Sequence, residues 1–184
     1  MPRLVPDCVV PRHKGAWTVD QVLQLPEDSD SRVELVDGAL MVSPAPSWRH
    51  QRILGNLYAL RDAVPAGTEM LIGVNIRLTS RRLLIPDFVV VICPGEDFLY
   101  GTAADVLLAA EIESPSSKVT DRLRKRQLYA EANIPYYLLV NPAADPVEVV
   151  LFELAGGQYH EITRSDGGTL TLDRPFAATM DLDV

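Results

Sequence analysis

One stretch of the sequence, VLLAAEIESPSS at residues 106–117, constrains the fold most strongly. It begins as an apolar run, which is typical of a buried β-strand, and Pro115 ends it. Side chains of a strand alternate between two faces, so Glu111 and Glu113 should point the same way. Two carboxylates on one face of a half-buried strand repel each other unless a cation lies nearby. The sequence therefore predicts a strand that ends beside a cation.

The length of 184 residues suits one domain with a sizeable core. We expect residues 1–184 to form a single domain, with residues 1–15 as a flexible arm. No apolar run approaches the roughly 18 residues that span a bilayer. The start of the chain is broken by prolines and lacks the apolar core of a signal peptide. We therefore expect a cytoplasmic protein.

The formal net charge is −8. This balance argues against a protein that coats nucleic acid irrespective of sequence, because such proteins are normally basic. It still allows an enzyme that holds phosphates through a metal ion and a local basic patch. Cys8 and Cys93 belong to no CxxC or Cys/His cluster, which argues against structural zinc.

Helical and extended patterns alternate along the chain and predict a mixed α/β or α+β fold, with a mixed central β-sheet flanked by helices. Helices are expected within residues 17–30, 47–64 and 120–133. A hairpin with its turn at Asp37-Gly38 is expected within residues 31–44. Further strands are expected at residues 68–80, 81–93, 106–113, 134–142, 146–154, 157–165 and 168–172. Pro86 interrupts the second of these and suggests an edge, a bulge or a bend there.

Three residues on neighbouring elements suggest chemistry. Asp87 follows Pro86, Glu111 lies on the next long strand, and Lys125 lies in the helix after it. If the two strands pair, both carboxylates converge at one end of the sheet, where they could bind Mg²⁺ or, as second choice, Mn²⁺. Such an ion would neutralise the acidic pair. A nearby lysine could then orient or deprotonate a water and stabilise a phosphoryl oxygen.

The third helix carries polar residues at helical spacing. Asp121, Lys125 and Tyr129 are each four residues apart and line one face. We expect the opposite stripe, which includes Leu123, to pack on the sheet. Two groups of arginines could line a path for a phosphate backbone: Arg77, Arg81 and Arg82, and Arg122, Arg124 and Arg126.

Each feature also has a purely structural interpretation. Asp121 and Lys125 could form only an exposed ion pair, worth roughly 0.3–0.5 kcal/mol. Asp87 could mark a bend at the entry of a strand. The pair Glu111 and Glu113 could lie on a solvated edge, and His50 could be a surface or capping residue. The combination is therefore more informative than any one of its members.

The combination resembles the PD-(D/E)XK nuclease superfamily and, more closely, the Uma-two family of restriction endonucleases. The matching segments cover residues 17–155 in the order of that family; the most distinctive is the block EIESPSSKVTDRLRKRQLYAEANIPYYLLVNP, residues 111–142. The resemblance implies a restriction-endonuclease-like core and members that are often dimeric. We therefore expect a homodimer.

The resemblance also implies roles for individual residues. Asp87, Glu111 and the Ile112 carbonyl would bind the metal ion. Lys125 would supply the lysine of the motif, since the usual position two after Glu111 holds Glu113 instead. The remaining matches are Glu34 as an additional catalytic acid, and Glu113, His50, Asp121 and Tyr129 in supporting roles.

Three functions remain open from the sequence. The first is a Mg²⁺-dependent endonuclease that hydrolyses phosphodiester bonds of nucleic acid, with DNA as the expected substrate. The second is a catalytically silent nuclease fold that acts in protein binding or assembly, which Glu113 and the acidic charge favour. The third is a metal hydrolase of small phosphorylated compounds, which would not need the arginine groups.

Overall fold

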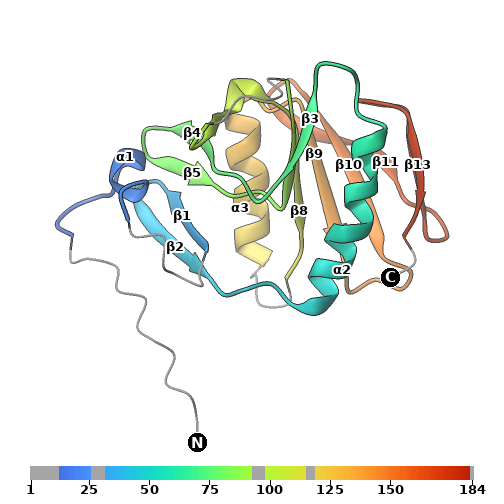
Figure 1. Cartoon of the computed structure of the whole chain (residues 1–184), viewed down its shortest axis with the longest axis horizontal. Coiled ribbons are helices and arrows are strands. Elements are labelled where there is room, and N and C mark those ends of the chain that lie inside the picture. Colours follow the sequence, from blue (N-terminus) through green and yellow to red (C-terminus); the bar gives the residue numbers. More distant parts are fainter. Residues whose placement is uncertain (1–12, 26–31, 93–97, 115–118, 183–184) are drawn as a thin grey trace, which may run out of the picture.

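The computed structural model describes residues 13–25, 32–92, 98–114 and 119–182, apart from the side chains of residues 119–122 (Figure 1). The helices are α1 (Val19–Val22), α2 (Trp48–Leu57) and α3 (Val119–Glu131), with 3-10 turns η1 (Tyr58–Asp62) and η2 (Ala103–Asp105). The strands are β1 (Arg32–Val36), β2 (Ala39–Ser43), β3 (Glu69–Ile72), β4 (Ile76–Thr79), β5 (Arg82–Leu84), β6 (Phe88–Val91), β7 (Gly101–Thr102), β8 (Val106–Ile112), β9 (Tyr136–Asn141), β10 (Glu148–Ala155), β11 (Gln158–Arg164), β12 (Thr169–Leu172) and β13 (Ala178–Asp181).

The central sheet is mixed, as the sequence predicts. Its strand order is β11-β10-β9-β8-β6-β3, and β8 pairs parallel with β9 while the other neighbours are antiparallel. A second sheet has the order β2-β1-β5-β4-β7, and β12 pairs with β13. The sequence did not predict this second sheet. It matters for function because it presents β1 to the end of the central sheet.

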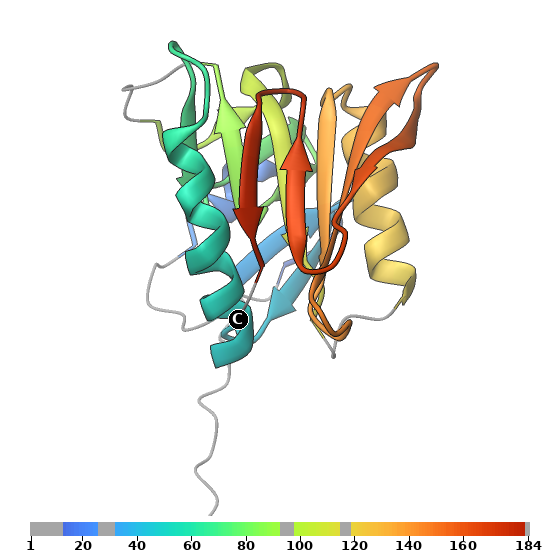
Figure 2. The same cartoon turned by 90° about the vertical axis from the view of Figure 1, so that its right-hand side faces the viewer.

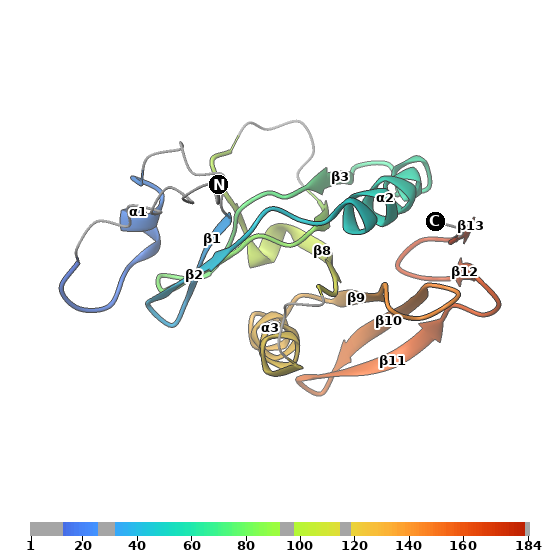
Figure 3. The same ribbon diagram turned by 90° about the horizontal axis from the view of Figure 1, so that it is seen from below.

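Helices α2 and α3 cover opposite faces of the central sheet (Figure 3). Ile53 and Leu57 of α2 pack in one apolar core, together with Val90 and Leu138 of the sheet. Hairpin β12–β13 lies beside α2 (Figure 2) and contributes to the same core. Leu128 of α3 packs in a second core on the other face. The alternation of side chains along β8 therefore decides which helix each residue meets.

Two of the predicted strands are each divided between the two sheets. The chain leaves β3 at Gly73, which has φ 62°, and continues as β4 in the second sheet. It returns from β5 to β6 through Pro86 and Asp87. The expectation of one continuous strand at residues 68–80 is therefore wrong, whereas the bend that Pro86 suggests is confirmed. Proline lacks the N–H needed inside a sheet, which explains why the break falls there.

Local signals in the sequence are confirmed elsewhere. The β1–β2 hairpin turns at Asp37 and Gly38, both with positive φ, as expected for a tight hairpin turn. The Ser47 hydroxyl accepts a hydrogen bond of 3.2 Å from the His50 N–H and so caps α2. The expected arm, residues 1–15, lies largely outside the described residues, as do Cys8 and Cys93. None of the described helices is both long and apolar enough to span a membrane.

The orientation of α3 corrects one expectation. Leu123 was expected to pack on the sheet, yet its side chain is 56% exposed. Tyr129 and Leu128 are buried instead. The polar face of the helix turns toward the sheet because the carboxylate that it contacts lies on the sheet itself.

Candidate active site

Four elements bring polar groups together at the carboxyl end of β8. Strand β8 supplies Glu111, the link between the sheets supplies Asp87, and β1 supplies Arg32 and Glu34. Helix α3 packs against the same end and supplies Lys125. Asp87 and Glu34 are buried charged residues at 3% and 7% exposure, so each must be paired within the protein.

Asp87 is held by three donors. Its Oδ2 accepts a hydrogen bond of 2.7 Å from the Ile112 N–H, and its Oδ1 accepts one of 2.9 Å from Arg32. The His50 Nε2 lies 3.2 Å from Oδ2. Burial by itself would raise the pKa of Asp87, but these contacts hold the pKa below its ordinary value. Asp87 is therefore charged at neutral pH.

Glu111 belongs to a second group of contacts on the α3 side. The Lys125 ammonium lies 3.0 Å and 3.2 Å from the two Glu111 oxygens and 2.9 Å from Glu34 Oε1. The Tyr129 hydroxyl donates a hydrogen bond of 2.6 Å to Glu111. The cation that the acidic strand requires is thus provided, among the described residues, by the protein itself. The Lys125–Tyr129 face predicted by helical spacing does meet Glu111.

The protonation of Glu111 is poised near neutrality. Burial raises the pKa of Glu111 to about 7, although the charge of Lys125 opposes this shift. For Lys125 the neighbouring charges outweigh burial. Burial alone would lower the pKa of Lys125, but Glu111 and Glu34 raise this pKa above its ordinary value. The Lys125 side chain is therefore a permanent cation near neutral pH.

The two groups of contacts are joined through β8. The Ile112 N–H reaches Asp87, and Ile112 directly follows Glu111. Within a strand, the N–H and C=O of one residue face the same neighbour. The Ile112 carbonyl therefore faces the Asp87 side too. Glu113 follows the strand, is partly buried, and donates its backbone N–H to Val140.

Arg32 is the residue that sequence reasoning missed. Its guanidinium bonds Asp87 and also donates to the Ile85 and Pro86 carbonyls, at 2.9 Å and 3.3 Å. These bonds fix the bend that presents Asp87. A usable signal exists in the sequence, because Arg32 lies two residues before Glu34 and so shares its face of β1.

Most of the predicted arginine path has partners inside the protein. Arg82 bonds Asp37 and Glu131, and Arg124 also bonds Asp37. The other engaged members are Arg77, which contacts Asp20 and Tyr100, and Arg126, which donates to the Tyr159 carbonyl and lies over Phe152. Arg81 is exposed, and the side chains of Arg122 and Asp121 lie outside the described residues. Recruiting the engaged arginines to phosphates would cost their present contacts.

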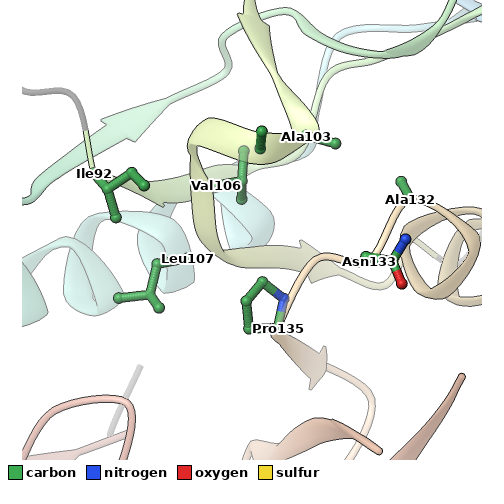
Figure 4. Close-up of a pocket in the computed structure, with 8 residues that line it drawn as sticks. Ile92, Ala103, Val106, Leu107, Ala132, Asn133 and Pro135 are labelled. Carbon is green, nitrogen blue, oxygen red and sulfur yellow. The ribbon is translucent and has the colours of Figure 1, made fainter. Parts of the chain in front are cut away.

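Two hollows differ in chemistry. A cavity of about 200 Å³ borders Asp87 and is lined by Arg32, His50, Gln51 and Gly73 among others. A larger one of about 380 Å³ lies at the opposite end of β8, beside the loop from α3 to β9 (Figure 4). Its lining is apolar apart from Asn133. The larger hollow lacks carboxylates and does not belong to the candidate active site.

No group of three or more His, Cys, Asp or Glu side chains among the described residues converges as the ligands of one metal ion. Mg²⁺ is nevertheless commonly held by only one or two carboxylates, with waters and substrate phosphates completing its shell. Asp87 and Glu111 are chemically suited to that smaller role.

A family model described as "Putative restriction endonuclease" (Uma2) matches residues 19–184. Among solved structures, the chain resembles the crystal structure of a "putative nuclease belonging to DUF820" from Anabaena variabilis ATCC 29413, with a TM-score of 0.70. The two chains are 19% identical, and the match covers 86% of this chain and 89% of that one. This likeness shows a common fold. No curated protein matches the chain significantly.

Proposed function

Because the chain belongs to the Uma2 family, described as "Putative restriction endonuclease", we propose that it is a divalent-metal-dependent endonuclease that hydrolyses phosphodiester bonds of DNA. One observation carries the proposal: Asp87 accepts the Ile112 N–H at the end of β8, and the preceding residue, Glu111, is paired with the Lys125 ammonium. Carboxylates beside a fixed cation are the groups that metal-assisted phosphodiester hydrolysis uses.

The donors at the end of β8 suit Mg²⁺, and Mn²⁺ is the second choice. Asp87 and Glu111 would hold the ion, since hard cations prefer carboxylate oxygens, and the Ile112 carbonyl could add a third ligand. The two acids lie close enough that the charge of Asp87, after burial, contributes to the raised pKa of Glu111. A bound ion would activate water and polarise the phosphate.

Lys125 would act in this reaction as a fixed positive charge. A group whose pKa is raised by Glu111 and Glu34 cannot take a proton from water near neutral pH. Lys125 would instead stabilise the negative charge that develops on the phosphoryl oxygens. Glu34 would keep the ammonium in place, because it shares Lys125 with Glu111.

Cleavage of plasmid DNA with Mg²⁺ or Mn²⁺ tests the proposal. Asp87→Asn and Glu111→Gln should each lower the rate about 100-fold or more, and Lys125→Met should act similarly, as for other charge-stabilising groups. Glu161→Gln, which changes an exposed carboxylate paired with Arg164, is the matched control and should cleave like the unmodified protein. Equal cleavage by Asp87→Asn and the unmodified protein would contradict the proposal.

A specific observation favours a second candidate, a silent nuclease fold that binds a protein partner. Lys125 already pairs with both Glu111 and Glu34, so the acids are neutralised without a metal ion. Calorimetric titration with Mg²⁺ and Mn²⁺ separates the two candidates. Ion binding that Glu111→Gln removes supports the endonuclease, and absence of ion binding supports the silent fold.

The assembly and compartment belong to the same proposal. We expect a homodimer, as the family resemblance implies, and a cytoplasmic location, where cellular DNA is accessible. Sedimentation velocity at micromolar concentration tests the dimer. A sedimentation coefficient that matches a single 20.3 kDa chain at every concentration would contradict it.

A further inference from the structure

Trp48 is the most exposed large apolar side chain among the described residues. It is the first residue of α2, and 83% of its surface is accessible. Tryptophan is normally well covered, although single exposed apolar residues occur on most surfaces. Exposure alone therefore assigns no role to Trp48. The role of Trp48 is inferred from its position and its neighbours.

The position of Trp48 connects it to the candidate active site. Two residues later, His50 contacts Asp87 at 3.2 Å. Three residues later, Gln51 lines the 200 Å³ cavity that Arg32 and Asp87 also border. Residues three apart on a helix are surface neighbours. Trp48 therefore lies on the same turn of α2 as two residues that line the cavity, on the solvent side of the helix.

Two unpaired cations share this part of the helix. Arg49 and Arg52 are exposed, and within the described part of the chain neither guanidinium forms an ion pair or a side-chain hydrogen bond. Arg52 lies four residues after Trp48, so the two share one face. Arg82 and Arg124, by contrast, are engaged with Asp37. In a chain of net charge −8, this helix turn is a place where a polyanion can approach with little loss of internal contacts.

An exposed aromatic ring beside free guanidinium groups matches the chemistry of an unpaired nucleic-acid strand. Bases of a single strand stack on aromatic side chains, while arginines contact the phosphates. A base inside a duplex has no free face for such stacking. We infer that the first two turns of α2 bind an unpaired segment of the substrate, with Trp48 stacked on a base and Arg49 and Arg52 on the backbone. This inference rests on the proposed function and specifies the form of its substrate.

Tryptophan fluorescence tests the stacking directly, because the chain has only two tryptophans. Trp17→Phe leaves Trp48 as the sole tryptophan, which excitation at long wavelength selects over the tyrosines, and Trp48→Phe leaves Trp17, which lies against His13 and packs on the core beside α1 and β1. Both variants are titrated with a short single-stranded oligonucleotide in EDTA, so that no cleavage occurs. We expect quenching in the first variant and little in the second. Equal quenching, or none in either, overturns the inference.

Affinity measurements add a second arm. Trp48→Ala should weaken binding of the single strand about 5- to 100-fold, the effect of one lost base stack, and should change duplex binding much less. Arg52→Ala should lower the slope of log K against log salt concentration by about 0.7, as for one phosphate contact on a single strand. Lys14→Ala removes an exposed positive charge before α1 and should leave both unchanged. Unchanged single-strand binding in Trp48→Ala overturns the inference.

The remaining outcomes separate this inference from the proposed function. If Trp48→Ala cleaves plasmid and binds single strands normally, the inference fails while the endonuclease stands. If the unmodified protein cuts no nucleic acid but Trp48 is quenched, the endonuclease fails and the binding site stands. If Trp48→Ala instead converts a dimer into monomers without quenching in the Trp48-only protein, this surface binds a second copy of the chain, and the inference is overturned.

Discussion

At the residue scale, each buried carboxylate of the site is matched by a cation from a distant part of the chain. Arg32 reaches Asp87 across 55 positions of sequence, and Lys125 reaches Glu111 across 14. The repulsion that the sequence predicts at the end of β8 is relieved by these internal pairs. Breaking such a pair leaves one buried charge without compensation, so single substitutions here should have large effects.

The raised pKa of Glu111 makes metal binding depend on pH. A metal ion needs the charged carboxylate, and protons compete for it below the pKa of about 7. The apparent Kd for Mg²⁺ should be nearly constant above pH 8 and rise about tenfold per unit as the pH falls below 7. Calorimetry between pH 5.5 and 8.5 measures this dependence. An affinity that is equal at pH 6 and pH 8 would contradict this prediction.

Arg32→Met should destabilise the protein at neutral pH. The pKa of Asp87 is lowered in the fold, so its contacts contribute stability above the unfolded value of 3.8, and this contribution is lost as the pH falls through the folded pKa. The guanidinium is partly exposed, which moderates the loss, and we expect the loss to be about 1–3 kcal/mol at pH 7. Urea unfolding at pH 7 and pH 3 measures it.

Arg81→Ala is the matched control, since Arg81 is exposed and has no ion pair among the described residues. Its free energy of unfolding should change by less than about 0.5 kcal/mol. A loss in Arg32→Met that stays constant down to the lowest pH at which the protein is folded would mean that packing of the arginine stem, rather than its charge, provides the stability.

At the element scale, the site depends on how the β1–β2 hairpin is anchored. The Gly38 carbonyl accepts a hydrogen bond from Trp17, and its N–H donates to the Arg81 carbonyl. These bonds tie the hairpin to α1 and to the second sheet. Strand β1 in turn places Arg32 and Glu34 beside the end of β8.

Gly38→Ala should therefore destabilise the fold by about 1–3 kcal/mol. Gly38 has φ 85°, and an added Cβ would lie 2.6 Å from the Ala16 Cβ, which is too close. Gly55→Ala in α2 is the control, because nothing lies within 4 Å of its added Cβ. It should stabilise the helix by about 0.5–1 kcal/mol. Thermal unfolding of both variants tests whether their effects on stability differ in this way. Equal shifts of Tm would refute the prediction.

At the scale of the whole molecule, the chain passes between the two sheets at two points. These are Gly73 and the bend at Pro86 and Asp87. One apolar core contains Ile76 and Leu84 of the second sheet together with Val89 of the central sheet. The sheets therefore share both covalent connections and buried contacts, which is the arrangement of one cooperative unit.

A single unfolding transition should follow, as the expectation of a single domain requires. Trp17 lies beside the second sheet and Trp48 lies on α2, so the two single-tryptophan variants report on different parts of the molecule. Each substitution can shift the stability of its own variant, so the urea midpoint of circular dichroism serves as the reference for that variant. Relative to this reference, the fluorescence midpoints of the two variants should agree. Two separate transitions in one variant would show that the sheets unfold independently.

Local sequence determined most of the elements. Ser47 caps α2, Asp37-Gly38 turns the hairpin, and Pro86 interrupts a strand, because each acts through its own backbone geometry. The period of β8 placed Glu111 on one face, and helical spacing placed Lys125 with Tyr129. These assignments require only neighbours within a few residues, and such neighbours are readable from the sequence.

Only the tertiary structure decided what those residues meet. Leu123 has an apolar side chain, yet it faces solvent, because α3 turns the Lys125 face toward the acid on β8. Spacing on β1 places Arg32 on the same face as Glu34, but its contact with Asp87 arises only because two strands are divided between two sheets. Pairing across such distances depends on which surfaces bury together, and that is a property of the packed chain as a whole.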